Sequence, residues 1–370
     1  MKVLLINEAC GFGSTGKICT DIAKELRGIG HDVKVAYGRF SYTAKTNEND
    51  YIRIGNSRTV FLHALITRLY DAHGYGSKSA TKKFLEWADS FEPDMIWLHN
   101  LHGYYINLEL LFRWIKMRPK LKIQWTLHDC WAFTGHCAYF TMAKCDKWKG
   151  RCGKCPNKRD YPASWWIDRS EKNYRQKKEL FCGIPNMLII TPSEWLASLV
   201  RQSFLAEYPI EVRYNTVDEN IFKPTKSDFR KKYGLNGKKI ILGVANIWDK
   251  RKGLDDFIKL SKMLDEKYAI VLIGLSPKQM KKIPSTIIGI HRVADARELA
   301  AIYSTSDVYV NASKEETFGM TTLEAIKCGA KTIVYDSTAG AELANKYDGI
   351  AVPEGVENLY QAIIELNRQC

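Results

Sequence analysis

The sequence contains no apolar run close to the roughly 18–20 residues that a membrane-spanning helix needs. Its opening run, residues 1–6, ends at Asn7-Glu8, which is too early for a signal peptide. Low-complexity tracts are also missing, and 45% hydrophobic with 26% charged residues is typical of a globular protein. We therefore predict a folded, cytoplasmic protein, and its 370 residues predict two domains.

Acidic residues are scarce in the first half of the chain. Residues 1–182 contain 30 Lys and Arg against 18 Asp and Glu, a balance of +12, whereas residues 183–370 contain 25 against 23, a balance of +2. A basic excess confined to one half favours an anionic partner. That partner can be nucleic acid, an anionic membrane leaflet or a phosphorylated substrate.

Strand-like and helical segments alternate along most of the chain. Short apolar runs predict buried strands at 2–7, 32–37, 95–99, 122–128, 187–191, 239–245, 269–274, 286–288, 308–310 and 331–334. The alternation indicates an α/β fold with two Rossmann-like, doubly wound domains, which we place at residues 1–185 and 186–370. Because ligands bind beyond the carboxyl ends of parallel strands, we expect the two domains to face a central cleft.

The segment 313–325, Ser-Lys-Glu-Glu-Thr-Phe-Gly-Met-Thr-Thr-Leu-Glu-Ala, gives the strongest functional signal. It follows a predicted strand and leads into a predicted helix, whose N-terminus near Thr321 would direct free N–H groups at an anion. Gly319 would let the backbone approach a ligand closely. Glu316 and Glu324, separated by seven residues, can accept hydrogen bonds from the hydroxyls of a sugar and a ribose.

This segment resembles the donor signature of retaining glycosyltransferases of family four, Glu-x7-Glu followed by Ala and small residues, which Ala325 and residues 328–330 match. The resemblance implies a GT-B fold and sugar transfer from a UDP- or GDP-sugar with retention of configuration. By resemblance, Glu316 is a catalytic residue that contacts the donor sugar, and Glu324 contacts the ribose. The backbone of the loop is expected to bind the diphosphate, at Phe318, Gly319, Met320 and Thr321.

A basic turn follows the predicted strand 239–245. The family places an arginine and a Lys-Gly pair here, and both bind the diphosphate because cations stabilise the charge of the leaving group. Lys252-Gly253 matches the pair, whereas Asn246 stands at the arginine position. Lys252 is therefore a predicted catalytic and donor-binding residue, and Arg251 is a candidate for the missing charge.

Glycine and histidine residues follow predicted strands of the first half. The family has a glycine-rich first loop near the donor phosphate and a histidine near the transferred sugar. By resemblance Gly13 takes the first role and His128 takes the second, as a catalytic residue. His99 and His102 follow a neighbouring strand, and together with His73 they are candidates for the acceptor side.

Five of the ten cysteines lie between Cys130 and Cys155. Disulfides are rare in a cytoplasmic chain, so this clustering predicts a metal site, although reduced thiols remain an alternative. The spacing of four of them suits tetrahedral zinc, which would be structural because no coordination position stays open: Cys137, Cys145, Cys152 and Cys155. The segment 130–166 resembles a Cys-rich insertion of a bacterial polysaccharide-synthesising subgroup of the family.

Residues 60–70 form an apolar, amphipathic stretch that can rest on an anionic membrane or pack in the core. We expect a nucleotide-sugar donor, a lipid-linked glycan acceptor, peripheral contact with the inner membrane face, and no nucleic acid. No Asp-x-Asp motif stands out, so essential magnesium is not expected. The predicted function is a hexosyltransferase-type glycosyltransferase in the synthesis of a cell-surface polysaccharide.

Two other functions fit parts of the sequence. A GT-B sugar-nucleotide epimerase or phosphorylase would share the fold but would use no glycan acceptor. A basic, zinc-containing nucleic-acid-binding protein would fit the net charge and the cysteines. It would leave the pair Glu316 and Glu324 without a role.

Overall fold

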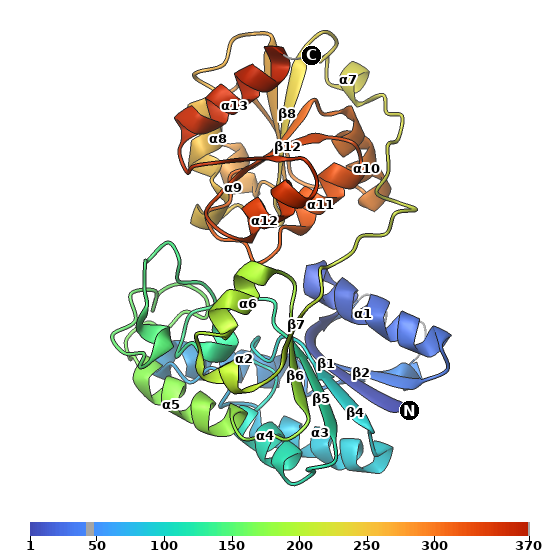
Figure 1. Ribbon diagram of the computed structural model, residues 1–370, viewed down its shortest axis with the longest axis vertical. Coiled ribbons are helices and arrows are strands. Elements are labelled where there is room, and N and C mark those ends of the chain that lie inside the picture. Colours follow the sequence, from blue (N-terminus) through green and yellow to red (C-terminus); the bar gives the residue numbers. More distant parts are fainter. Residues whose placement is uncertain (42–47, 369–370) are drawn as a thin grey trace. The chain divides into compact units, whose positions relative to one another are not determined.

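The computed structural model describes residues 1–41 and 48–368, which form two compact units, Met1–Arg213 and Tyr214–Cys370. Residues 369 and 370, the end of the predicted second domain, lie outside the described residues. Each unit contains one parallel β-sheet with helices packed against it (Figure 1). The predicted α/β class with two Rossmann-like halves is therefore confirmed. In the described part of the chain no helix is long and apolar enough to cross a membrane.

The first unit has a seven-stranded sheet in the order β3-β2-β1-β4-β5-β6-β7. Its strands are β1 Lys2–Cys10, β2 Asp32–Ser41, β3 Tyr51–Arg53, β4 Met95–Leu98, β5 Lys122–Thr126, β6 Met187–Thr191 and β7 Ile210–Val212. Its α-helices are α1 Gly13–Gly28, α2 Ser57–Tyr70, α3 Lys78–Phe91, α4 Leu108–Lys116, α5 Ser170–Phe181 and α6 Glu194–Val200. Short 3₁₀ turns occur at η1 Glu48–Asp50, η2 Trp131–Phe133, η3 Lys147–Lys149 and η4 Phe204–Glu207.

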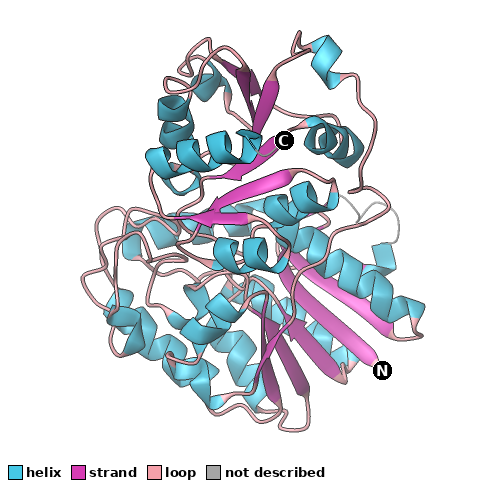
Figure 2. Cartoon of the chain, turned by 45° about the horizontal axis from the view of Figure 1, so that its top comes forward, coloured by secondary structure: helices cyan, strands magenta, loops and turns pink. Residues whose placement is uncertain are grey.

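The second unit has a six-stranded sheet in the order β10-β9-β8-β11-β12-β13. In Figure 2 the strands are magenta and the helices are cyan. Its strands are β8 Lys239–Val244, β9 Tyr268–Ile273, β10 Ile287–Ile290, β11 Val308–Asn311, β12 Lys331–Tyr335 and β13 Ile350–Val352. Its α-helices are α7 Phe229–Lys232, α8 Leu254–Leu260, α9 Pro277–Met280, α10 Ala296–Thr305, α11 Met320–Lys327, α12 Ala339–Lys346 and α13 Val356–Arg368, with a 3₁₀ turn η5 Lys250–Lys252.

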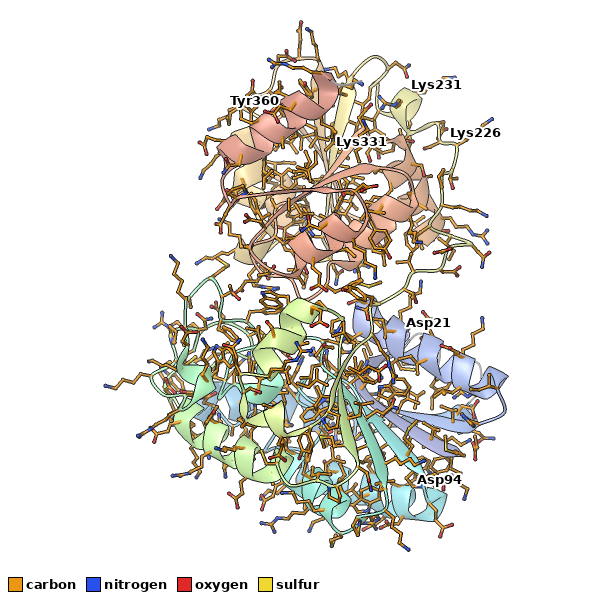
Figure 3. The ribbon with its side chains drawn as sticks, in the orientation of Figure 1. Asp21, Asp94, Lys226, Lys231, Lys331 and Tyr360 are labelled. Atoms are coloured by element: carbon orange, nitrogen blue, oxygen red, sulfur yellow. The ribbon has the colours of Figure 1, made fainter. Side chains whose placement is uncertain are left out.

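Alternate strand residues enter two different cores, because successive side chains of a strand point to opposite faces of the sheet. In β8, Ile241 packs with α8 and α13, whereas Ile240 and Leu242 pack with α7, α10 and α11. Both faces of the sheet are thus covered, which is why the strands appear in the sequence as continuous apolar runs. In the first unit the backbone N–H of Lys2 donates to Asp94 at 2.7 Å, joining the amino ends of β1 and β4. Asp94 is labelled in Figure 3.

The predicted boundary at residues 185 and 186 is corrected by the pairing of β6 and β7. β6 pairs in parallel with β5, with Ile123 opposite Met187, and β7 extends the same sheet. Both strands therefore complete the first sheet instead of starting the second. The first unit ends at Arg213, whose N–H donates to Thr191 at 2.9 Å.

The cysteine-rich segment 130–166 contains only the turns η2 and η3 as regular structure. Asp71, in the left-handed conformation after α2, anchors it: one carboxylate oxygen lies 2.6 Å from Nδ1 of His136, and the other accepts the N–H of Arg169 at 2.8 Å. The carbonyl oxygen of Asp71 accepts from Asn173 of α5 at 2.7 Å. The buried ammonium of Lys177, also on α5, donates to two carbonyl oxygens of the segment. This segment is therefore held by α2 and α5.

Candidate active site

The loops after β8 and β11 lie side by side at the carboxyl edge of the second sheet. These two strands are neighbours although β9 and β10 separate them in sequence, so the winding of the sheet reverses between them. Open α/β sheets bind ligands at such a switch point. Lys252 follows β8 and Glu316 follows β11, so the structure brings the two predicted donor motifs together.

The ammonium of Lys252 and the carboxylate of Glu316 form an ion pair, with side chains only 22% and 14% exposed. Two backbone contacts fix the loops that carry them. The N–H of Lys314 donates to the carbonyl of Arg251 at 2.8 Å. Gly253 has φ +71°, and a Cβ there would lie 2.3 Å from the carbonyl oxygen of Ala312, so only glycine fits.

The charge state of Glu316 follows from this pairing. Burial alone raises the pKa of its carboxyl, but the charge of Lys252 outweighs burial and holds the pKa below its ordinary value. Glu316 is therefore an anion at neutral pH. It can accept hydrogen bonds from hydroxyl groups, as binding of a donor sugar requires, but it cannot donate a proton.

Gly319 precedes α11 with φ +97°, so the chain turns sharply between the loop and the helix. The helix begins at Met320, and its first N–H groups have no partner within the helix, which makes this end attractive to an anion. The side chain of Thr321 accepts from Tyr309 of β11 at 2.8 Å. Phe318 is buried in a small cluster with Leu323 and Leu343, which holds the loop in place.

Glu324 is the fifth residue of α11, which starts at Met320, so it lies one turn from the N-terminus of the helix. Its carboxylate accepts a hydrogen bond from the hydroxyl of Tyr303 on α10 at 3.1 Å. Tyr303 is fully buried, so this contact fixes the direction of the glutamate.

Arg251 is held by its own loop. Its guanidinium forms an ion pair with Asp249 at 2.9 Å, and its N–H donates to the other carboxylate oxygen at 3.0 Å. The structure thus places Arg251 in the same turn as Lys252. Asn246, at the family's arginine position, is exposed.

The glycine loop of the first unit connects β1 to α1. Gly11 and Gly13 both have positive φ, and the N–H of Gly11 donates to the carbonyl of Gly16 at 3.0 Å. A Cβ at Gly13 would meet nothing within 4 Å. Gly13 is therefore needed for its backbone conformation, and the space beside it is open.

His99 and His128, at the carboxyl ends of β4 and β5, are stacked, with Nδ1 of His99 3.0 Å from Nε2 of His128. Burial lowers the pKa of His128 to about 4 and the pKa of His99 well below its ordinary value. Both rings are therefore neutral near pH 7. His128 can act there as a hydrogen-bonding group but not as a cation.

His102 follows the same strand end as His99 and takes part in a second polar cluster. Its Nε2 lies 2.8 Å from the carboxylate of Asp129, and its Nδ1 lies 3.0 Å from the hydroxyl of Tyr161. Burial lowers the pKa of His102, but Asp129 more than offsets burial, so the pKa is raised above 6.5. His73 accepts the N–H of Gly103 at 3.0 Å.

The structure therefore brings the four predicted histidines to one edge of the first sheet and adds partners that sequence analysis did not select. Asp129 follows His128 in the sequence. Its position directly after a predicted strand is the signal that could have identified it as a site residue. Tyr161 belongs to the cysteine-rich segment, 59 residues from His102, and nothing local indicated the contact.

The four predicted zinc ligands line one small cavity of about 10 Å³ in the cysteine-rich segment. The N–H of Gly135 donates to Sγ of Cys152 at 3.2 Å. Cys145 packs against the same core. Within residues 1–41 and 48–368, however, no group of three or more His, Cys, Asp or Glu side chains is arranged to hold a metal ion.

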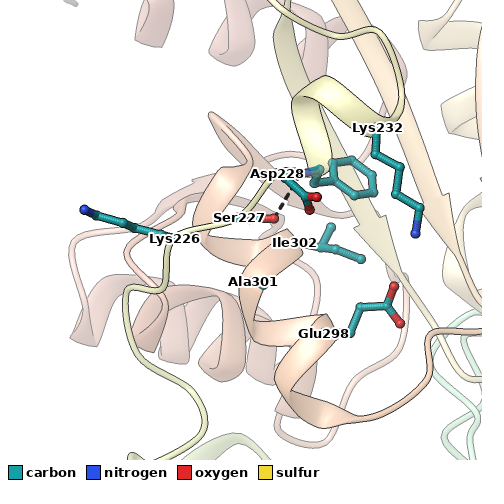
Figure 4. A pocket seen from close by; sticks show the side chains of 8 residues that line it. Lys226, Ser227, Asp228, Lys232, Glu298, Ala301 and Ile302 are labelled. Carbon is teal, nitrogen blue, oxygen red and sulfur yellow. Dashed lines mark hydrogen bonds between the residues drawn. The ribbon is translucent and has the colours of Figure 1, made fainter.

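A hollow of about 510 Å³ lies elsewhere in the second unit, between α7 and α10 (Figure 4). Its lining includes Phe229 and Ile302, with Lys232 and Glu298 at its side. None of the donor-motif residues lines it. Its lining combines charged, polar and apolar side chains. It does not contain the paired cation and carboxylate that the loops after β8 and β11 bring together.

Both units are α/β domains with a parallel sheet. At the switch point of the second sheet, a basic motif follows β8 and an acidic motif follows β11. This combination defines the class of GT-B glycosyltransferases. The family model described as Glycosyltransferase Family 4 matches residues 15–221, more than half of the chain, and the model described as Glycosyl transferases group 1 matches residues 238–369. The chain therefore belongs to glycosyltransferase family 4 and is a glycosyltransferase. These matches do not favour an epimerase, a phosphorylase or a nucleic-acid-binding protein.

Individual relatives agree with this assignment. The chain is 23% identical over 370 residues to the colanic acid biosynthesis glycosyl transferase WcaC of Escherichia coli strain K12, covering 96% of this chain and 88% of that protein. It is 27% identical over 130 residues, 34% of each chain, to the N,N'-diacetylbacillosaminyl-diphospho-undecaprenol alpha-1,3-N-acetylgalactosaminyltransferase of Campylobacter jejuni. Among solved structures, HepE of Anabaena in complex with UDP shares the fold with a TM-score of 0.68 at 16% identity, covering 100% of this chain and 90% of that one.

Proposed function

We propose that the protein transfers a sugar from a UDP- or GDP-sugar to a hydroxyl of a growing glycan, with retention of anomeric configuration. The observation that carries the proposal is the Lys252–Glu316 ion pair beside the N-terminus of α11, at the switch point of the second sheet. A cation and free N–H groups suit a diphosphate, and an adjacent buried carboxylate suits sugar hydroxyls.

In this mechanism the diphosphate leaves the sugar while Lys252, Arg251 and the α11 N-terminus stabilise its negative charge. The acceptor hydroxyl forms the new bond on the face that the diphosphate leaves, and a phosphate oxygen of the donor takes its proton. Glu316 positions the sugar and Glu324 holds the ribose. Charge stabilisation by protein groups makes essential magnesium unnecessary.

The acceptor side is assigned to the carboxyl edge of the first sheet. His128 and His99, both neutral, can exchange hydrogen bonds with hydroxyls, and His102 with Asp129 adds a polar pair. His73 supports this edge through Gly103. Gly13 leaves the backbone of the first loop accessible beside it.

We further propose that the acceptor is a lipid-linked glycan of a cell-surface polysaccharide, and that the protein works in the cytoplasm at the inner membrane face. The name of the E. coli relative refers to colanic acid, and the name of the C. jejuni relative refers to a diphospho-undecaprenol-linked sugar. The basic first half of the chain suits contact with such an anionic acceptor.

A structural zinc ion remains part of the proposal, with Cys137, Cys145, Cys152 and Cys155 as its ligands. Four thiols lining one cavity are the donor set that zinc prefers. Because the described residues contain no preformed ligand group, binding of zinc requires these side chains to move closer together. The ion would stabilise the segment and take no part in transfer.

The donor assignment is tested by thermal shift with UDP, GDP, ADP and CMP, because a ligand that binds the folded state raises the melting temperature. We expect UDP or GDP to give the largest shift. Transfer from the matching labelled sugar nucleotide, followed by determination of the product anomer, tests retention. Release of product from donor alone would instead indicate an epimerase or hydrolase and would overturn the proposal.

A further inference from the structure

Helix α2 buries polar side chains and exposes large apolar ones, which is the opposite of most helices in a soluble protein. Its buried residues are the polar His63 and Thr67. Its exposed residues are predominantly large and apolar, and Phe61 is 67% exposed; the others are Leu62, Leu65, Ile66 and Tyr70. Of the apolar stretch that the sequence predicted for either a membrane or the core, only its first residue, Val60, packs partly buried against the core cluster, whereas the five large side chains just named are exposed.

The polar side of α2 faces inward because His63 has a specific set of partners there. Its Nε2 accepts the N–H groups of Gly74 and Gly76, each at 3.1 Å, and its Nδ1 lies 3.0 Å from the hydroxyl of Ser77. Burial lowers its pKa to about 4, so the ring is neutral. A Cβ at Gly76 would lie 2.4 Å from Cγ of His63, so this residue pair fixes the rotation of the helix.

The exposed apolar surface continues from α2 onto the cysteine-rich segment and the residue that follows it. The N–H of Trp165 donates to the carbonyl of Arg68 at 2.8 Å, which joins the two elements. Trp165, Trp166 and Ile167 are all exposed, Trp166 to 70%. We call the exposed residues of α2 together with Trp165, Trp166 and Ile167 the α2–Trp166 face. An apolar surface formed by two adjoining elements usually marks an interaction site.

Positive charge borders this face. α2 contains two arginines and no acidic residue, and the cysteine-rich segment 130–166 contains seven Lys and Arg against two Asp. The guanidinium of Arg68 lies 5.7 Å from the ring centre of Trp165, and the ammonium of Lys158 donates to the carbonyl of Trp166 at 2.9 Å. The carboxylate of Asp168, beside Ile167, accepts the N–H of Cys155 in the segment and the N–H of Ser170 at the start of α5.

We propose that the α2–Trp166 face docks on an anionic lipid bilayer, with its aliphatic and aromatic side chains at the level of the headgroups and acyl chains. Tryptophan and tyrosine prefer this interfacial depth, and lysine and arginine pair with anionic headgroups. The choice of a membrane rests on the proposed lipid-linked acceptor. His63, on the inner side of the same helix, lies 6.1 Å from the ring of Tyr104 and 6.2 Å from the ring of His73, so docking would bring the acceptor-side histidines near the membrane surface.

The test is co-flotation of the full chain with vesicles of equimolar phosphatidylglycerol and phosphatidylcholine. Wild type should float with them, less with phosphatidylcholine alone, and less at high salt because the charges are screened. The double variant Phe61→Ser, Trp166→Ser should lose at least about tenfold in partitioning, since each substitution removes a large apolar side chain from the contact. The matched control, Ile29→Ser, Met117→Ser, replaces two residues that are 68% and 70% exposed elsewhere in the first unit, and it should bind as wild type does.

Absence of vesicle binding by wild type, or equal loss in both double variants, overturns the proposal. A second result would also overturn it: light scattering shows a dimer, the variant Phe61→Ser, Trp166→Ser alone dissociates that dimer, and no protein binds vesicles. The face would then bind a second copy of the chain and not a membrane. Melting temperatures of all variants should match wild type, since the replaced side chains are exposed. Vesicle binding without any sugar transfer would leave this inference standing and reject the proposed function.

Discussion

The ammonium of Lys252 and the carboxylate of Glu316 neutralise each other although they lie in different loops, 64 residues apart in the sequence. Gly253 packs against Ala312 directly beneath them, so the pair is set by the backbone and not by the side chains alone. A donor that carries a diphosphate and a sugar offers a new partner to each member of the pair. The ion pair thus keeps Glu316 charged and holds both side chains in place before the donor binds.

Replacing Glu316 by Gln should lower kcat/KM for transfer by roughly 10- to 100-fold, because a hydrogen bond to a charged group contributes about 1.5–3 kcal/mol. The side chain keeps its size but loses the charge that pairs with Lys252, so the melting temperature should fall while the variant stays folded. Steady-state kinetics with the preferred donor measures the effect. Glu365→Gln, an exposed glutamate on α13, is the matched control. Wild-type kinetics for Glu316→Gln would remove Glu316 from the donor site.

Lys252→Ala should weaken binding of UDP or GDP by about tenfold or more, because the variant loses a cation that faces the diphosphate. Lys250→Ala removes an exposed lysine of the same 3₁₀ turn and should have little effect. Isothermal titration with the nucleotide compares the two variants. Equal losses would mean that the turn attracts the nucleotide by its general charge and that Lys252 has no specific contact.

The pair His102 and Asp129 should make stability depend on pH. The pKa of His102 is raised in the folded protein, so its contribution is complete below 6.5 and disappears as pH rises through the raised value. The pKa of Asp129 is lowered, so its contribution is present above 3.8. Asp129→Asn should therefore cost roughly 3–5 kcal/mol between pH 3.8 and 6.5 and less at higher pH.

Urea unfolding of wild type and Asp129→Asn across this range measures that difference. Glu8 and Lys177 also act on the pKa of His102, so both variants are compared at the same ionic strength. His31→Asn, which changes a histidine outside the cluster, should show no such pH dependence. A cost for Asp129→Asn that is constant from acid to neutral pH would contradict the assigned pKa shift.

Purified protein should contain about one zinc ion per chain, and a chelator should lower its melting temperature because zinc binding contributes to folding. Cys152→Ser should reproduce this loss, whereas Cys182→Ser, which replaces the cysteine directly after α5 and outside the cluster, should not. Binding of UDP or GDP to the second unit should survive in both. A zinc content near zero in a stable protein, with all cysteines reduced, would reject the metal.

The strands and the donor motif were predictable because their signals are local. β8 and β12 are short apolar runs in the sequence. The donor motif is recognised by the seven residues that separate Glu316 from Glu324. The domain boundary was wrong because the pairing of β6 with β5 crosses the irregular cysteine-rich segment, and no local signal encodes it. The direction of the apolar face of α2 depends on the amide groups that His63 meets at Gly74 and Gly76, which no pattern within the helix reveals.

Asp71 connects three parts of the first unit through one buried residue. Its carboxylate contacts His136 and the N–H of Arg169, and its carbonyl accepts from Asn173. The end of α2, the cysteine-rich segment and the start of α5 therefore cannot open one at a time without leaving a buried charge unpaired. In native-state hydrogen exchange, the amides of these three parts should behave as one cooperative unit, with a common free energy of opening.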